Sequence, residues 1–230
     1  MSDSPPLPAA PRWLLAIDSS TDQAGVALFD GQRLAELTWT AGRTQTTSLL
    51  SEIDHLLRLQ GVDLDDIAAI AVANGPGAFS GLRVGFGIAK GLSLARGTPL
   101  LGVPTLAAAA LPWSAQAALV IAVVQAGRGR IVWAEYGRVD GAWTQSAPPL
   151  NGTPTELISR CTEISSEATV TGELQSTLVA ELTALPGITV PGASLRLRRP
   201  GSVAELAWAR FSRDESDDPG SLAPVYLHGR

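Results

Sequence analysis

The sequence predicts an α/β protein built from two lobes, each with a mixed β-sheet and flanking helices. Short apolar runs that suit buried strands alternate with longer stretches whose apolar residues recur at helical spacing. A strand–turn–strand pattern opens the chain at residues 13–40 and returns, less regularly, at residues 118–138. We therefore expect a first lobe over residues 12–111, a second lobe over residues 112–230, and a disordered, Pro-rich tail over residues 1–11.

The first lobe is predicted to open with three antiparallel strands joined by tight turns. The apolar run WLLAID ends in Asp18, and Asp30-Gly31 is a strong hairpin signal before the third strand. A helix with leucine and isoleucine along one stripe follows, and Gly61 ends it. The elements expected in this lobe are strands over residues 13–18, 24–29, 33–40, 67–73 and 100–103, and helices over residues 46–60, 81–95 and 105–111.

The second lobe is expected to repeat the order of strands and turns, but its pattern is less regular. The elements expected here are strands over residues 118–124, 131–138 and 169–171, and helices over residues 155–160, 173–184 and 202–213. The last ordered piece is expected over residues 222–227.

Composition and charge limit the classes of protein that this chain can be. Its 230 residues can bury a core, and 45% of them are hydrophobic, which is ordinary for a globular protein. The net charge of −5 argues against a protein that binds nucleic acid by itself. A single cysteine, Cys161, excludes a disulfide within the chain and suits the reducing cytoplasm. No apolar run is long enough to span a membrane, and residues 1–11 do not have the pattern of a signal peptide.

A glycine-rich turn between a strand and a helix is the most informative local feature. It contains Gly75 and Gly77, and Ser80 and Gly81 lie at the expected start of the helix. Free backbone N–H groups and the helix dipole make such a junction a natural anion site. The same glycines could equally serve only the tight turn of the backbone. The segment is not a Walker A loop, because no Gly-Lys-Ser/Thr follows it.

A second candidate site lies where the first strand ends. Asp18 closes a strand that should be buried, and Ser19, Ser20 and Thr21 follow it. The Asp18 carboxylate could hold Mg²⁺ through water while the hydroxyl groups reach phosphate oxygens. The alternative is that Asp18 only caps the turn.

The remaining polar residues give little sign of catalysis. His55 and His228 are the only histidines, and neither has a second ligand at the spacing of a zinc site. Cys161 has no activating neighbour, so we expect a buried structural thiol. The basic cluster within residues 196–199 is interpreted as a solvated edge or a local phosphate contact.

The helix expected over residues 81–95 has more apolar surface than a single core contact needs. Val84, Ile88 and Leu92 form one apolar edge, and a second apolar edge lies beside it. Together the apolar or small arc covers roughly 200°, about twice the stripe of one contact. Glycines four residues apart would let another helix approach closely, and they need a reason in a helix interior. The helix is covered on two sides, either by its own fold alone or by its own sheet and a partner.

Several motifs together resemble the TsaB family, also called YeaZ. The resemblance lies in Leu15-Ala16-Ile17-Asp18-Ser19-Ser20, in the turn from Gly75 to Arg83, in Lys90-Gly91-Leu92 and in Pro224-Val225-Tyr226-Leu227. It covers residues 14–106 well and the rest of the chain in pieces. The resemblance implies an ASKHA-type fold, the two-lobed duplication of actin-like proteins and sugar kinases.

The same resemblance implies a function. TsaB-like proteins are non-catalytic partners of TsaD, the subunit that transfers threonylcarbamoyl to the tRNA adenosine adjacent to the anticodon, and a TsaE-type ATPase joins the pair. By this resemblance the chain would bind TsaD through the two first-lobe helices. The interface residues expected there are Leu49, Ile53, Leu56, Val84, Ile88 and Leu92. The net charge and the single cysteine agree with a cytoplasmic chain that meets tRNA only indirectly, and in the absence of TsaD the same helix surface could form a homodimer.

Two departures from related proteins bear on activity. The paired histidines that bind metal in TsaD-like proteins are absent from residues 43–49, and Gln125 and Arg130 replace the acids of a second motif. We therefore expect no catalytic residue, no metal and no required cofactor. The vestigial nucleotide or phosphate site, if it is retained, would consist of Asp18, Ser19, Ser20, Gly75, Gly77, Ser80 and Gly81.

The alternative function is an ASKHA-type, ATP-dependent phosphotransferase with Asp18 and the Gly75–Gly81 loop at the phosphates. Gln125, where an acid is expected, counts against it. A metallopeptidase is a third interpretation, and the scarcity of histidine argues against it.

Overall fold

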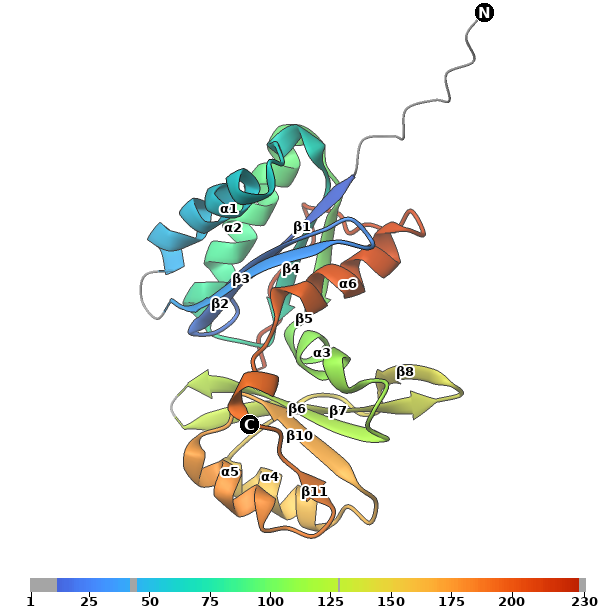
Figure 1. Cartoon of the computed structure of the whole chain (residues 1–230). Coiled ribbons are helices and arrows are strands. Elements are labelled where there is room, and N and C mark those ends of the chain that lie inside the picture. Colours follow the sequence, from blue (N-terminus) through green and yellow to red (C-terminus); the bar gives the residue numbers. More distant parts are fainter. Residues whose placement is uncertain (1–11, 42–44, 128, 228–230) are drawn as a thin grey trace, which may run out of the picture.

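The computed structural model describes residues 12–41, 45–127 and 129–227, so the tail expected over residues 1–11 lies outside the described residues. The described chain forms two lobes, drawn one above the other in Figure 1. Each lobe is a mixed sheet with helices against it, which confirms the predicted fold class. Within the described residues, no helix is long and apolar enough to cross a membrane.

The first lobe contains a five-stranded sheet in the order β3-β2-β1-β4-β5. β1 (Trp13–Asp18), β2 (Gln23–Phe29) and β3 (Leu34–Thr40) form the predicted antiparallel meander. β4 (Ile67–Gly75) runs parallel to β1, and β5 (Leu100–Pro104) runs parallel to β4. Because parallel strands end at the same edge of a sheet, the end of β1 lies beside the glycine turn that follows β4.

Helices cover both faces of the first sheet. α1 (Gln45–Gln60) and α2 (Phe79–Arg96) pack together on one face, over a core that they share with β1, β2 and β4. α6 (Pro200–Phe211) covers the opposite face, although it follows the second lobe in the sequence. The division of the chain at residue 111 stays a prediction. The chain nevertheless returns to the first sheet after it has formed the second lobe.

The second lobe contains six strands, with β11-β10-β6-β7-β8 as the main path and β9 paired with β7. The strands are β6 (Leu119–Gly127), β7 (Arg130–Val139), β8 (Ala142–Gln145), β9 (Leu150–Gly152), β10 (Ala168–Gly172) and β11 (Ile188–Thr189). α4 (Pro154–Thr162) and α5 (Ser176–Thr183) pack on one face of this sheet. α3 (Thr105–Ala110) packs on the other face, between the lobes.

Short 3₁₀ helices complete the described structure. They are η2 (Leu64–Asp66), η3 (Leu111–Trp113) and η4 (Ala193–Leu195). η4 belongs to the segment that leads from the second lobe back to α6, and this segment also contains Arg198.

Some element boundaries differ from the predicted ones for physical reasons. The helix expected from residue 173 begins at Ser176, because Glu173 turns away to bind the end of β6. The helix expected from residue 202 begins at Pro200, since a proline with its fixed φ suits the first helical turn. β8, β9 and β11 were not predicted, because strands of four, three and two residues are too short to show an alternating pattern.

Candidate functional site

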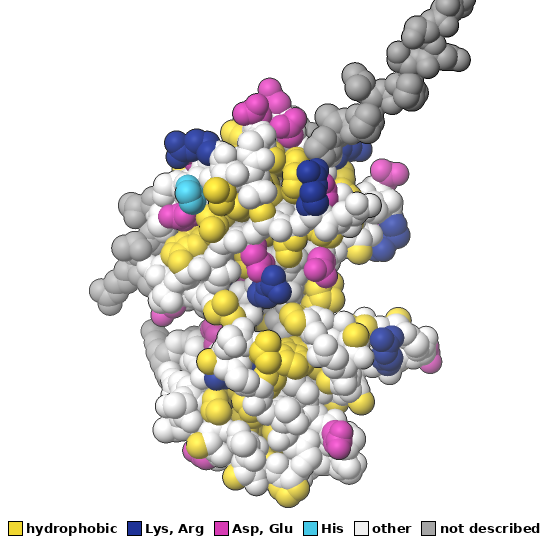
Figure 2. Space-filling view, viewed as in Figure 1, with side chains coloured by type: hydrophobic (Ala, Val, Ile, Leu, Met, Phe, Trp, Pro, Cys, Tyr) yellow, Lys and Arg dark blue, Asp and Glu magenta, His cyan; other side chains and the backbone are white. Residues whose placement is uncertain are grey.

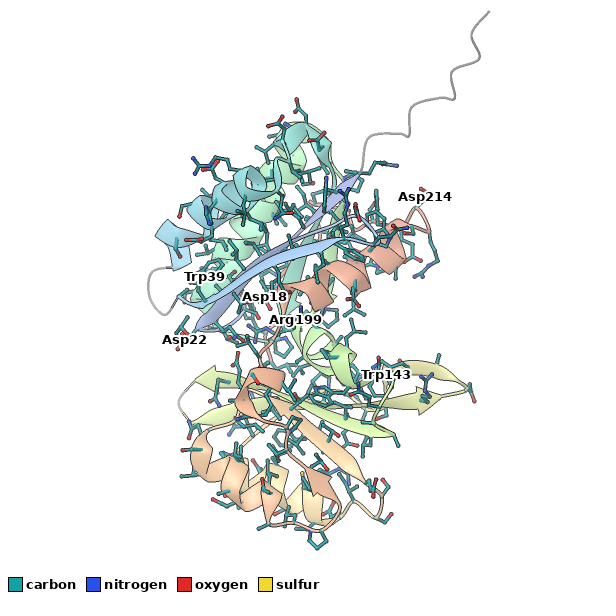
Figure 3. All side chains as sticks on the ribbon, in the orientation of Figure 1. Asp18, Asp22, Trp39, Trp143, Arg199 and Asp214 are labelled. Atoms are coloured by element: carbon teal, nitrogen blue, oxygen red, sulfur yellow. The ribbon has the colours of Figure 1, made fainter. Side chains whose placement is uncertain are left out.

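A cleft of about 690 Å³ lies between the two lobes. Thr21 and Gln23 line it from the first lobe, and Gln125 and Glu173 line it from the second. Figure 2 shows the molecule narrowing between the lobes, and Figure 3 shows Asp18 and Asp22 at the edge of the first lobe that faces the second. The carboxyl ends of β1, β6 and β10 all point toward this junction, so the turns after these strands form the walls of the cleft.

Asp18 lies behind the wall of the cleft and is almost fully buried. Its Oδ1 accepts hydrogen bonds from the backbone N–H and the hydroxyl of Ser20, at 3.0 and 2.6 Å. Its Oδ2 accepts a hydrogen bond from Nε of Arg198 at 2.5 Å. Protein groups therefore occupy both oxygens of the carboxylate that the sequence suggested for Mg²⁺.

Arg198 is the cation of this site, and its side chain is only 1% exposed. The interpretation of residues 196–199 as a solvated edge is therefore wrong for Arg198, although Arg199 is exposed. The difference arises because Asp18 and Glu173 both offer carboxylates to Arg198, the latter at 2.6 Å. Burial lowers the pKa of Arg198, and the two carboxylates raise it by more, so the net shift is upward.

The glycine turn packs against the backbone that follows β1. The N–H of Ala78 donates to the carbonyl of Ser20 at 2.6 Å, and a Cβ at Gly77 would lie 2.0 Å from the same oxygen. The hydroxyl of Ser19 donates to the carbonyl of Gly81 at 2.8 Å. The structure thus brings Asp18 and its two serines together with the glycine turn, through contacts within the chain itself.

Gly75 and Ser80 complete the set of predicted phosphate-site residues. Gly75 has φ of +103°, a conformation that favours glycine, and its N–H donates to Thr105 Oγ1 at 3.1 Å. A Cβ at Gly75 would also lie 2.5 Å from the carbonyl of Val225. Ser80 is exposed at the start of α2. The geometry accounts for Gly75 and Gly77 as turn residues, and phosphate binding by this set stays a prediction.

Gln125 and Arg130, the two departures from the family motif, have structural partners in the second lobe. The Gln125 backbone N–H donates to the Glu173 carboxylate at 3.0 Å, and its side-chain amide donates to the Glu173 carbonyl at 2.9 Å. Arg130 donates to the side chain and the carbonyl of Asn151, at 2.8 and 2.6 Å. Gln125 therefore positions Glu173, which in turn contacts Arg198.

Sequence reasoning missed Glu173 and the role of Arg198. Glu173 comes directly after the short, buried strand β10, and Asp18 is the last residue of β1, so a search for acids at strand ends could have selected Glu173 as well. Arg198 gave no such signal, because its partner Asp18 is 180 residues away in the chain.

Cys161 and His55 lie in places that give no sign of catalysis. Cys161 is buried, and the loss of solvent raises the pKa of its thiol to about 11, which suits an unreactive core residue. His55 is exposed on α1, and His228 lies outside the described residues. Among the residues that the structure describes, no three His, Cys, Asp or Glu side chains form a group that could hold a metal ion.

The six residues expected at a partner interface fall into two groups. Leu49, Ile53 and Leu56 are buried in the core beneath α1, where they have almost no surface left for a partner. Val84, Ile88 and Leu92 are half-buried at the edge where α2 meets α1. Any interface on these helices therefore depends on Val84, Ile88 and Leu92 and on exposed residues near them. Sequence periodicity alone could not distinguish these residues from the buried ones.

A groove of about 500 Å³ lies between α1 and α2 on the outer side of the first lobe. Leu50, Leu57 and Leu92 contribute apolar walls, and Asp54 and Asp63 lie among the polar residues that line it. Leu50 is 54% exposed, so part of the apolar surface of α1 faces solvent in the isolated chain.

The two mixed sheets, the helices between and around them, and the cleft at their junction define a two-lobed α/β fold of the ASKHA type. The structure of YeaZ from Pseudomonas aeruginosa is similar over 94% of this chain and 99% of that chain, with a TM-score of 0.76 and 27% sequence identity. The family model for TsaD, tRNA N6-adenosine threonylcarbamoyltransferase, matches residues 40–173.

Relatives in sequence carry the name tRNA threonylcarbamoyladenosine biosynthesis protein TsaB. The protein of that name from Escherichia coli is 38% identical over 56% of this chain and 58% of its own length. The one from Haemophilus influenzae is 39% identical over 42% of this chain and 41% of its own length. The sequence matches thus span about half of these two relatives. Together with the family model and the structural match, they show that the chain belongs to the TsaB (YeaZ) family.

Proposed function

We propose that this chain is a non-catalytic subunit of the system that forms threonylcarbamoyladenosine in tRNA, next to the anticodon. In this proposal it binds and supports a TsaD-type transferase, a TsaE-type ATPase joins the pair, and tRNA is contacted mainly by the partners. The names of the E. coli and H. influenzae relatives support the pathway. The match of the TsaD family model supports a partner built on a similar fold.

The outer strip of α2 is the observation that carries the proposal. We define this strip as Ser80, Gly87, Gly91 and Leu94, which share one side of the helix and are exposed. A Cβ at Gly87 or Gly91 would meet no atom within 4 Å, and Leu94 is 70% exposed. Each glycine costs up to about 1 kcal/mol in a helix interior. Since nothing in the described structure uses the space beside these two glycines, a partner that packs there explains them.

A helix is the partner element that fits the outer strip. The distance between two packed helices depends on the side chains at their contact, so two glycines one turn apart allow a close approach. The half-buried Val84 and Ile88 and the exposed Leu50 of α1 extend this surface with apolar groups. Arg83 and Lys90 flank the strip and can meet acidic side chains of the partner at its rim.

The substitution Gly87→Gln tests the proposed interface. The glutamine side chain has open space in the isolated chain and is a better helix former, so the free energy of unfolding should rise by up to about 1 kcal/mol. The same side chain would separate the two helices, so the affinity for a TsaD-type partner should fall at least ~10-fold. Calorimetric titration of the two purified proteins measures the affinity, and urea denaturation measures the stability.

Gly192→Gln is the matched control. Gly192 is also exposed, has no atom within 4 Å of a built Cβ, and lies in the second lobe. This variant should bind the partner as the unchanged chain does. If Gly87→Gln binds the partner as tightly as the unchanged chain does, the interface does not lie on the outer strip of α2. Reconstituted tRNA modification that proceeds equally well without the chain would remove the proposed function as a whole.

The phosphotransferase alternative is not favoured. Asp18 is already paired with Arg198, and Gln125 stands where that chemistry would need an acid. A chain of this type would also need an open anion site at the glycine turn, and Gly77 instead packs on the backbone of Ser20. A subunit of a tRNA-modifying system would be located in the cytoplasm, which the single, buried Cys161 also suits.

A further inference from the structure

The guanidinium of Arg198 joins the two lobes behind the wall of the cleft. Arg198 lies in the segment between η4 and α6, where the chain passes from the second lobe to the first. It pairs with Asp18 at the end of β1 in the first lobe and with Glu173 after β10 in the second. Glu173 is itself held by Gln125 at the end of β6. One side chain thus connects the ends of three strands from two sheets.

All the hydrogen-bond partners of this guanidinium are oxygen atoms. Nε donates to Asp18 Oδ2 at 2.5 Å, and Nη1 donates to Glu173 Oε1 at 2.6 Å. Nη2 donates to Asp18 Oδ1 at 3.4 Å, to Thr21 Oγ1 at 3.0 Å and to the Gln23 carbonyl at 3.1 Å. Two carboxylates, a hydroxyl and a carbonyl are also the ligand types that hard divalent cations prefer. We call these four groups the oxygen cradle.

The charges explain why a cation is needed at this place. Asp18 and Glu173 contribute two negative charges, and the side chain of Asp18 is only 3% exposed. Two carboxylates that approach each other in a poorly solvated site repel strongly unless a cation lies between them. Without a cationic side chain between the lobes, that cation would have to come from a bound ligand. In this protein, Arg198 supplies it.

We propose that Arg198 is a built-in cation, which fills the oxygen cradle shared by the two lobes and holds the lobes at one angle without a ligand from outside. Removal of the guanidinium would leave the two carboxylates with hydrogen-bond donors but no cation between them, so the lobes would separate until water reaches them. An added divalent cation could then take the vacated position.

A distance measurement between the lobes in Arg198→Ala tests the proposal. Spin labels on Gln32→Cys in the first lobe and Ala180→Cys in the second report the angle between the lobes, since both positions are exposed. Cys161 is buried and should not take up label. The unchanged chain should give one narrow distance distribution, and Arg198→Ala should lose it. Addition of Mg²⁺ alone should restore a narrow distribution in Arg198→Ala and leave the unchanged chain as it was.

Arg199→Ala is the matched control, because Arg199 is the next residue and pairs with Glu36 of the same lobe. It should keep the narrow distribution. If Arg198→Ala does not fold, Glu173→Gln replaces it, since this change weakens the second-lobe half of the contact and keeps the Asp18 pair. A folded variant, either Arg198→Ala or Glu173→Gln, with an unchanged distance distribution would overturn the proposal. If the distance distribution of Arg198→Ala is broad and Mg²⁺ does not narrow it, the oxygen cradle is not a cation position.

Discussion

Gly77 and Gly91 are both glycines near or in α2, but their surroundings differ completely. A Cβ at Gly77 would lie 2.0 Å from the carbonyl oxygen of Ser20, which is backbone and cannot move away cheaply. A Cβ at Gly91 would meet no atom within 4 Å. The first glycine is required by packing within the chain, whereas no contact among the described residues requires the second.

The same substitution should therefore have opposite effects at these two positions. Gly77→Ala should lower the free energy of unfolding by about 1–3 kcal/mol, because the turn must shift away from Ser20. Gly91→Ala should raise it by up to about 1 kcal/mol, because alanine favours the helix. Urea denaturation followed by circular dichroism measures both. A neutral Gly77→Ala would mean that the turn after β4 is looser than its contacts indicate.

Single residues were predictable where the signal was local. Asp18 could be selected because it ends an apolar strand, and Cys161 could be assigned to the core because no activating group adjoins it. The partner of Asp18 could not be selected, since Arg198 is adjacent to the exposed Arg199 and shares its local composition. Only the return of the chain to the first sheet distinguishes the two arginines.

The segment of residues 222–227 acts as an element of structure although it forms no helix or strand. The Val225 N–H donates to the carbonyl of Asn74 in the first lobe at 2.7 Å. Two residues later, the side-chain amide of Asn151 in β9 donates to the carbonyl of Leu227, also at 2.7 Å. The ring of Tyr226 lies 5.2 Å from that of Phe79 at the start of α2. The segment therefore spans both lobes and covers the glycine turn.

Asn151→Ala should release this segment. The change removes the donor to Leu227 and the acceptor for Arg130, so the free energy of unfolding should fall by about 1–3 kcal/mol. Hydrogen exchange at the Val225 N–H should become faster, while exchange within β4 stays slow. Thr144→Ala, at an exposed position of β8, should change neither quantity. Equal exchange at Val225 in both variants would show that Asn151 does not hold the segment.

Elements were predictable from the sequence when they were long and had one dominant period. The position of α1 followed from the spacing of leucine and isoleucine, that of α2 from the glycine turn before it and its apolar edges, and the strands of the first meander from the turns between them. Periodicity could not tell which side of α1 faces the sheet and which side is free. The sequence prediction therefore assigned Leu49, Ile53 and Leu56 to a partner, whereas the exposed leucines of this helix include Leu50 and Leu59.

At the scale of the whole molecule, the first lobe is completed by residues from the far end of the chain. α6 buries Val203, Ala204 and Ala207 against the face of the first sheet formed by Leu14 and Ala16. Without α6, this face would be open to water. The first sheet can therefore reach its native packing only when residues beyond the second lobe are present.

A fragment of residues 12–111 should consequently fail to fold by itself. Its uncovered apolar face should leave it largely unfolded or aggregated, by circular dichroism and gel filtration. Mixing it with a separately purified fragment of residues 112–227 should restore helical signal and a compact complex, since that fragment carries α6. A fragment of residues 12–111 that unfolds cooperatively when alone would contradict this dependence.

The two-lobed architecture was predictable because strands and helices alternate in both halves, and the resemblance of the motifs to a known family supported it. The path of the chain between the lobes was not predictable. A division at a single residue assumes that each lobe is continuous in sequence, but contacts of α6 with β1 and β2 join residues almost two hundred positions apart.

The position of α6 also governs the order of events during synthesis. A ribosome has to add residues 200–211 before the sheet begun at residues 13–18 can receive its cover. A nascent chain that stops early therefore has an unfinished first lobe, with an open apolar face that proteases and chaperones recognise. Only a translation product that already contains residues 200–211 can present α1 and α2 on a finished scaffold, so shorter products are withheld from assembly by their own failure to fold.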